Sequence, residues 1–293
     1  MACNHPQNSN SRRAVSLLSA VAGALSFLAT ASSGDYAKAD ARKPIRWLFA
    51  GPAIAALASD VNAARLLADS QPFLMAGRPV REVPLNWNAV HIHSCKSLSE
   101  IRNALAPGGL DPNVRGILYD YENWEFTPEE EQRNPALFVK QAADTVHAHG
   151  LLFFTAPAVD LVPVLAPGSD LRRQDDTYLR LNLAADAARY ADVFDIQAQR
   201  FERNTQLYAR FVREAAAQAK LANPNVVVLA GVSTQPSGQF VTADDIVAAI
   251  NATHGIVDGY WFNIPKPSTY SPRVTEFRPD IAVEVLRRLA AQE

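Results

Sequence analysis

The chain has 293 residues, of which 48% are hydrophobic and 20% are charged, and its formal net charge is −2. This composition is typical of a packed globular protein, and the length suits one large barrel or two small domains. No basic stripe or acidic tail interrupts the sequence, which argues against nucleic acid and against an anionic membrane surface as partners.

The N-terminal part has the pattern of an export signal. Two arginines precede an apolar run over residues 14–31, and a small-residue cleavage site ends at Ala39. We therefore expect residues 1–39 to be removed, leaving residues 40–293 as one secreted or periplasmic domain without membrane attachment. An uncleaved anchor is the alternative, because about 18 apolar residues is the lower limit for crossing a bilayer. The many Ala and Ser residues favour cleavage.

Short apolar runs then alternate with amphipathic stretches. The runs expected as strands cover residues 47–50, 73–75, 89–93, 116–121, 151–155, 193–198, 226–230 and 257–262. Helices are expected at 136–149, 175–190, 205–221, 243–253 and 280–291, with Thr242 as an N-cap. About eight such units predict an α/β fold, a single-domain (β/α)₈ TIM barrel. A doubly wound open sheet is the competing fold, but the Gly-rich phosphate turn usual after its first strand is missing.

The fourth expected strand carries the most informative residues. Leu118, Asp120 and Glu122 fall on one face, and in such barrels the site lies at the C-terminal strand ends. Two neighbouring carboxylates raise the pKa of one of them, which can keep an acid protonated near neutral pH. A glycosidase needs such an acid to protonate the leaving oxygen. A salt bridge to Arg115, or a helix N-cap, is the structural alternative.

A second carboxylate on a late strand would serve as a nucleophile, but none is found there. The seventh strand has no acid, and Asp258 lies at the N-terminal end of the eighth, away from the mouth. Substrate-assisted chemistry remains, in which a 2-acetamido group of the sugar attacks. Asp120 would hold that group, and Glu122 would act as acid and then as base.

The stretch from Arg115 to Glu122 resembles the fourth-strand signature of family 18 glycoside hydrolases, the chitinases and endo-N-acetylglucosaminidases, which reads D-x-x-D-x-D-x-E. The resemblance implies that Glu122 is the catalytic acid/base and that Asp120 orients the acetamido group. Arg115 and Leu118 stand where the signature has its first two acids. The sequence therefore predicts a retaining hydrolase of an N-acetylhexosamine-containing glycan. Alternatives are a catalytically inactive glycan-binding barrel, or a glycosidase of another chemistry in which Asp120 or Asp195 is the nucleophile.

Polar and aromatic side chains at other strand ends are candidates for substrate binding, because amides can pair with sugar hydroxyls and an indole can stack on a sugar ring. A hydrogen-bonded barrel layer and core tryptophans are the structural alternatives. One amide of the sixth strand resembles a glutamine of plant-type family members, and Trp261 resembles their floor tryptophan. The candidates are Asp195, Gln197, Gln199, Trp261 and Asn263, with Trp124 and Trp87 in outer loops and Asp160 as a further pocket acid.

His91 and His93 alternate with Val90 and Ile92 on the third strand, so both imidazoles are expected to point inward. A metallohydrolase would need more histidines on later strands, and strands five to eight have none. We therefore expect contact with substrate or a polar barrel layer, with no metal and no cofactor. Cys95, the only cysteine left after cleavage, is expected to be a buried inert thiol. The expected partner is an oligosaccharide or polysaccharide, and the expected state is a monomer.

Overall fold

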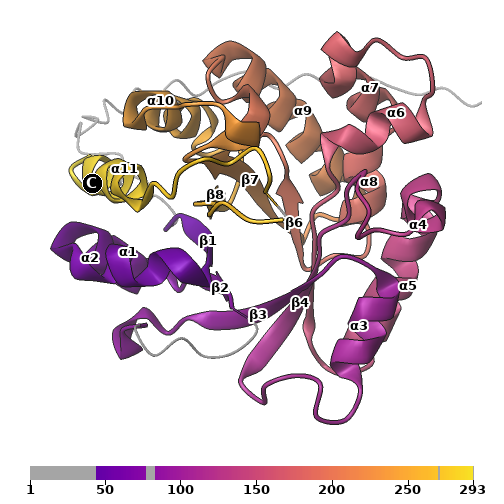
Figure 1. The fold of residues 1–293 in the computed structure, drawn as a ribbon, viewed down its shortest axis with the longest axis horizontal. Coiled ribbons are helices and arrows are strands. Elements are labelled where there is room, and N and C mark those ends of the chain that lie inside the picture. Colours follow the sequence, from indigo (N-terminus) through magenta and orange to yellow (C-terminus); the bar gives the residue numbers. More distant parts are fainter. Residues whose placement is uncertain (1–43, 77–82, 270, 293) are drawn as a thin grey trace, which may run out of the picture. The chain divides into compact units, whose positions relative to one another are not determined.

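The computed structural model describes residues 44–76, 83–269 and 271–292. Eight parallel strands pair in chain order, and β8 pairs back to β1 to close a barrel. The predicted (β/α)₈ TIM barrel is therefore confirmed (Figure 1). The expected export segment and its cleavage site lie outside the described residues.

Each expected strand is present in the barrel. The strands are β1 Arg46–Ala50, β2 Phe73–Met75, β3 Val90–Cys95, β4 Val114–Tyr119, β5 Leu152–Thr155, β6 Val193–Ile196, β7 Val227–Ser233 and β8 Gly259–Asn263. Strands β4 and β6 end earlier than expected, so Asp120 and Gln197 stand just beyond the last residue of their strands. The backbone N–H of Asp120 still donates to the carbonyl of Cys95 at 2.9 Å, which holds Asp120 beside the end of β3.

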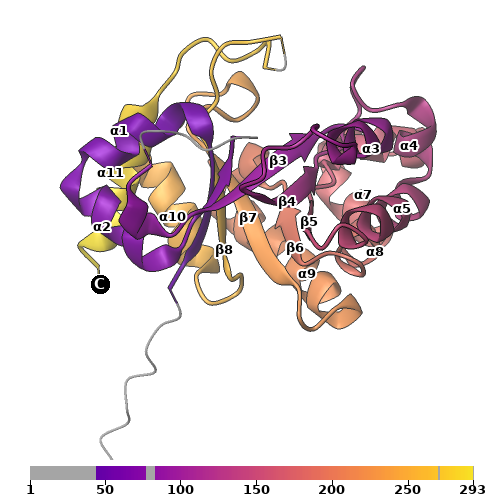
Figure 2. The same ribbon diagram turned by 90° about the horizontal axis from the view of Figure 1, so that it is seen from below.

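Helices surround the strands, as Figures 1 and 2 show. They are α1 Ile54–Ser59, α2 Val61–Ser70, α3 Leu98–Leu105, α4 Glu129–Arg133, α5 Pro135–His147, α6 Val162–Leu165, α7 Gln174–Arg180, α8 Leu183–Ala188, α9 Thr205–Ala222, α10 Ala243–Thr253 and α11 Pro279–Ala290. Short 3₁₀ helices cover Gly51–Ala53, Leu85–Trp87, Val159–Leu161, Leu171–Arg173, Gln199–Phe201 and Pro236–Gly238. No helix in the described ranges has the length and hydrophobicity needed to cross a bilayer.

Thr242 caps α10 as predicted, and its side chain and that of Asp245 form a reciprocal capping box. The single helix expected over residues 175–190 was wrong. It is divided into α7 and α8 by Asn182, whose φ of 55° lies in the left-handed region. Asparagine tolerates this conformation better than most residues. The amphipathic pattern continues through the turn, so the periodicity of the sequence does not reveal it.

The barrel has an inner apolar layer, separate from the apolar layer between strands and helices. The inner layer holds Leu48, Phe73, Ile92, Leu118, Phe154, Ala156, Val193, Leu229 and Trp261. The apolar strand residues that alternate with them point outward and pack against the helices. Leu118 thus lies directly in the packed interior, two residues before Asp120, as the alternation of the fourth strand predicts.

Two side chains outside the strands are buried. Trp87 was expected in an outer loop, but it is fully buried in the outer apolar layer, because the short 3₁₀ helix folds it against the core. Glu131 of α4 is also buried. Its carboxylate accepts hydrogen bonds from the Leu98 N–H at 3.0 Å and from the Tyr119 hydroxyl at 2.5 Å. Glu131 therefore ties the start of α3 to β4.

The packing of Leu118 generates a stability prediction. Leu118→Ala should lower the free energy of unfolding by roughly 2–5 kcal/mol, because it opens a cavity in the inner layer. Leu221→Ala on α9 makes the same chemical change at a position 88% exposed, and should alter stability by no more than about 0.5 kcal/mol. Urea denaturation of both variants measures the contrast, and equal effects would contradict the assignment of Leu118 to the core.

Candidate active site

The C-terminal ends of β3, β4 and β6 bring four polar side chains together. The amide nitrogen of Gln197 donates to Asp120 Oδ1 at 3.1 Å and approaches Glu122 Oε1 at 3.5 Å. Lys96 Nζ lies 3.2 Å from Asp120 Oδ2, and both of these side chains are largely buried. The Asp120 and Glu122 carboxyl groups therefore lie on either side of one amide, with a cation beside Asp120.

The loop after β4 is folded back onto the end of β3 by one threonine. The Thr127 hydroxyl donates to the backbone carbonyl of Lys96 at 2.9 Å. It accepts from the Trp124 indole N–H at 2.8 Å and from the Glu122 backbone N–H at 3.3 Å. Thr127 thereby fixes the backbone of Glu122 and the ring of Trp124 relative to Lys96.

The environment of Glu122 favours its protonated form. Burial raises the pKa of Glu122, and the negative charges of Asp120 and Asp160 raise it further, to about 8. The Gln197 amide and the Lys96 ammonium act in the opposite direction but do not outweigh them. A carboxylic acid that keeps its proton near neutral pH can serve as a general acid.

Asp160 follows β5 and lies in the 3₁₀ helix Val159–Leu161. Its Oδ1 accepts a hydrogen bond at 3.1 Å from the backbone N–H of Asn123, the residue after Glu122. Burial raises the pKa of Asp160 above its usual value, and the Asn123 hydrogen bond opposes that shift. Asp160 therefore accepts a hydrogen bond from the loop that carries Glu122 and also adds a negative charge near Glu122.

Asp195 lies one layer deeper on β6, two residues after Val193 of the inner apolar layer. It is 2% exposed, and neither of its oxygens has a hydrogen-bond partner among the described residues. Burial, together with the charge of Asp120, raises the pKa of Asp195 well above its usual range. An unpaired carboxyl at this depth is a neutral acid, because an isolated buried charge is far too costly.

Gln199 continues the line of polar residues from β6. Its amide nitrogen donates to Gln197 Oε1 at 3.3 Å, so it orients the side chain that bridges the two carboxyl groups. Strand β7 leaves room for it at Gly231, where any Cβ would collide with the Gln199 amide oxygen. Gln197 and Gln199 are thus connected by a hydrogen bond, whereas Asp195 makes no described hydrogen bond to either.

The aromatic candidates occupy different places. Trp261 is 7% exposed and packs in the inner apolar layer, with no described partner for its indole N–H. Trp124 lies beside the carboxyl pair, with Lys96 Nζ 5.9 Å from its ring centroid. Asn263 ends β8 and its backbone carbonyl accepts from Thr234. No hydrogen bond described for the Asn263 side chain joins it to the carboxyl pair.

The expected inward orientation of His91 and His93 is wrong. Val90 and Ile92 belong to the inner apolar layer, so the histidines that alternate with them face away from the axis. The side chains of β3 alternate as expected, but the apolar Val90 and Ile92 occupy the interior, because the layer below the mouth is close-packed. Within the described ranges, no group of three or more His, Cys, Asp or Glu side chains is arranged to hold a metal ion.

Lys96 and Thr127 are the site residues that the sequence analysis missed. Lys96 extends the inner alternation of Val90, Ile92 and Ser94 by one step, whereas the sequence interpretation placed the opposite face of β3, with His91 and His93, inward. Thr127 gave no such signal, because its role depends on how the loop folds. Cys95, on the opposite face, is buried and its thiol pKa is raised by burial to about 12, which agrees with an unreactive thiol.

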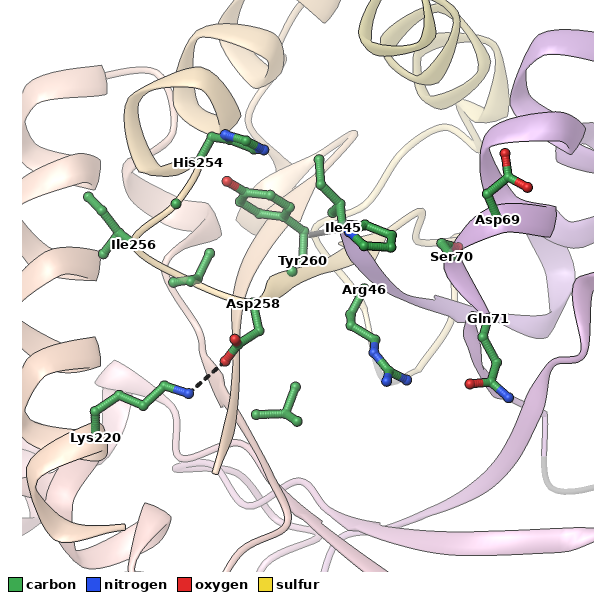
Figure 3. A pocket seen from close by; sticks show the side chains of 15 residues that line it. Ile45, Arg46, Asp69, Ser70, Gln71, Lys220, His254, Ile256, Asp258 and Tyr260 are labelled. Atoms are coloured by element: carbon green, nitrogen blue, oxygen red, sulfur yellow. Dashed lines mark hydrogen bonds and ion pairs between the residues drawn. The ribbon is translucent and has the colours of Figure 1, made fainter. Parts of the chain in front are cut away.

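A cavity of about 940 Å³ lies at the opposite, N-terminal end of the barrel, beside the start of β1 and β8 (Figure 3). Two of its charged side chains, those of Lys220 and Asp258, pair with each other at 2.8 Å. Lys220 also donates to a backbone carbonyl, and Asp258 accepts from the Val228 N–H. In these barrels this end contributes to stability rather than to catalysis.

The chain matches no protein-family model and no curated protein. Among solved structures it is similar to the spore cortex-lytic enzyme SleL of Bacillus megaterium, with 10% identity, coverage of 83% of this chain and 74% of that chain, and a TM-score of 0.44. It is also similar to a candidate alpha-L-fucosidase of Bacteroides thetaiotaomicron, with 10% identity, coverage of 85% of this chain and 83% of that chain, and a TM-score of 0.43. For Rhizobium etli pyruvate carboxylase the identity is 12%, the coverage is 86% of this chain and 28% of that chain, and the TM-score is 0.42. Similarity at this level carries no information on the reaction or the substrate.

The raised pKa of Glu122 predicts a pH dependence of stability. A carboxyl with a raised pKa stabilises the fold below its unfolded pKa, and this contribution is lost as pH rises through the folded pKa. The stability of the wild type relative to Glu122→Gln should therefore fall between pH 4.5 and about 8 and level off above. Chemical denaturation across this range measures it, with the exposed Glu130→Gln as a control that shows no such trend. Parallel curves for wild type and Glu122→Gln would refute the assignment.

Proposed function

We propose that the protein is an exported O-glycoside hydrolase that cleaves an N-acetylhexosamine-containing glycan with retention of configuration. The observation that carries the proposal is the pair of Asp120 and Glu122 at the mouth of the barrel, bridged by Gln197, with one member protonated near neutral pH. Glycosidases use a pair of carboxyl groups in which one donates a proton and the other stabilises positive charge.

Glu122 is the acid/base in this proposal. In the first step it donates its proton to the glycosidic oxygen as the bond to the anomeric carbon breaks. The resulting carboxylate then removes a proton from the water that attacks the same carbon in the second step. A pKa of about 8 leaves Glu122 protonated at neutral pH, as the first step requires.

The nucleophile is assigned to the substrate. The inward positions at the ends of β7 and β8 carry Gly231, Ser233, Trp261 and Asn263, none of them an acid. Asp195 is neutral and buried, which makes it a poor nucleophile. The carbonyl oxygen of a 2-acetamido group can instead attack the anomeric carbon, while Asp120 accepts the acetamido N–H and stabilises the cyclic cation. The resemblance of β4 to the family 18 signature supports the same roles.

The proposal extends to location and partner. An export signal over residues 1–39 would place the mature protein outside the cytoplasm, as a secreted or periplasmic monomer, where glycans of cell walls and matrices are available as oligomeric or polymeric substrates.

A catalytically inactive glycan-binding barrel is the second candidate. The observation in its favour is that Leu118, at a position that is acidic in the resembled signature, is buried in the inner apolar layer. Asp120 therefore lacks the neighbouring acid on its own strand. Binding without turnover by the wild type would support this candidate.

Glu122→Gln removes the transferable proton with little change in volume. It should reduce hydrolysis by at least about 10²–10⁴-fold while binding is retained. The measurement is a hydrolysis screen of wild type and variant against chitin oligomers, peptidoglycan, and neutral and galactosamine-rich polysaccharides. Equal activity of the two proteins on a cleaved substrate would remove Glu122 from the mechanism.

Asp120→Asn tests the substrate-assisted route. The variant should lose most of the rate, because the amide cannot stabilise the cationic intermediate as a charge does. Proton NMR of the first product formed by the wild type should show the anomer of the substrate, and the de-N-acetylated substrate should resist cleavage. An inverted product, or equal cleavage without the acetyl group, would point to a different nucleophile.

A further inference from the structure

We propose that Lys96 is a positioning residue that holds Asp120 as the charged member of the pair and so leaves the transferable proton on Glu122. The catalytic consequence rests on the proposed function, whereas the placement of the proton is a property of the unliganded protein. Two features of the mouth carry the inference: an unequal supply of hydrogen-bond donors and the position of the ammonium group.

The donors reach the two carboxyl groups unequally. The Gln197 amide has two N–H bonds but three acceptors around it. The nearest is the Ala156 carbonyl at 2.9 Å, followed by Asp120 at 3.1 Å, and Glu122 is last at 3.5 Å. The good hydrogen bonds therefore go to Ala156 and Asp120. Donors directed at one carboxylate favour its charged form, so this arrangement selects Asp120.

Lys96 also favours the charged form of Asp120, from the side opposite Gln197. Its ammonium contacts Asp120 Oδ2 at 3.2 Å, so Asp120 has a donor on each oxygen. No described hydrogen bond joins Lys96 Nζ to Glu122. The Lys96 side chain is 17% exposed and that of Asp120 9%, so solvent screens the pair only weakly.

The Lys96 side chain is held in place by its surroundings. Ser94, two residues earlier on β3, accepts a hydrogen bond from Nζ, and the Trp124 ring lies beside the ammonium. The backbone N–H of Lys96 donates to Glu100 Oε2 at 2.6 Å, and its carbonyl accepts from Thr127. Lys96 is thus fixed at both main chain and side chain, as a residue that sets the geometry of a neighbour needs to be.

The other charged groups around the pair do not replace Lys96. On the β5 side, Asp160 raises the pKa of Glu122, and on β6 Asp195 is neutral. Arg200 acts on Asp160 and hydrogen-bonds to Gln174. Removing Lys96 would leave Asp120 as a buried anion beside three other carboxyl groups, and a proton would then be shared between Asp120 and Glu122.

The test is Lys96→Met, with Lys96→Arg to retain the charge. In Lys96→Met both limbs of the pH–rate profile should move to higher pH, the alkaline limb by about one unit, because removal of a nearby opposite charge favours the protonated carboxyl. Lys96→Arg should stay near the wild type. Lys220→Met is the matched control, since it removes an ammonium paired to Asp258 at the far end of the barrel, and neither limb should move (Figure 3).

A readout that needs no substrate separates the two proposals. Carbon-13 NMR of labelled carboxyl groups, with Glu122→Gln to assign the signal, follows the titration of Glu122 directly. An upward shift of that titration in Lys96→Met supports the inference even if no glycan is cleaved. An unchanged titration overturns it, as does a uniform fall in rate at every pH in the variant.

Discussion

The cost of burying charge governs the mouth of this barrel. Asp120, Glu122, Asp160 and Asp195 are brought to neighbouring strand ends, and burial raises the pKa of three of them above its ordinary value. A cluster of this kind is stable only if protons or cations compensate it. The Lys96 ammonium, which contacts Asp120, and the raised pKa of Asp195, which favours its protonated form, provide this compensation.

The fold creates this situation through the inner apolar layer. Leu118 and Trp261 fill the interior below the mouth and keep water away from the carboxyl groups above them. Desolvation is the largest cause of the raised pKa of Glu122, so the packed interior contributes directly to its acidity. Stability and chemistry are therefore linked, because a cavity at Leu118 that admits water would also weaken the proton affinity of Glu122.

Most of the fold could be predicted from the sequence, because the strands are near-continuous apolar runs and the helices are amphipathic. The phase of β4 also predicted that Asp120 and Glu122 share a face. Which face of β3 points inward could not be predicted, because the sequence fits either the face of His91 or the face of Ile92. Only the packing of the interior decides between them. The loop contacts of Thr127 and the turn at Asn182 depend on tertiary geometry that leaves no periodic signal.

Leu118 and Lys96 are best understood together. In the family 18 signature that β4 resembles, an acid stands at the position of Leu118 and shares a hydrogen bond with the next acid of the strand. Here the layer below Asp120 already contains the buried acid Asp195, and another carboxyl beside it would add a second uncompensated group. Leucine at position 118 avoids the cost of burying that group. Asp120 accepts its hydrogen bonds from Lys96, after β3, and from Gln197, after β6. The donors that reach Asp120 thus come from the ends of β3 and β6, on the two sides of the mouth.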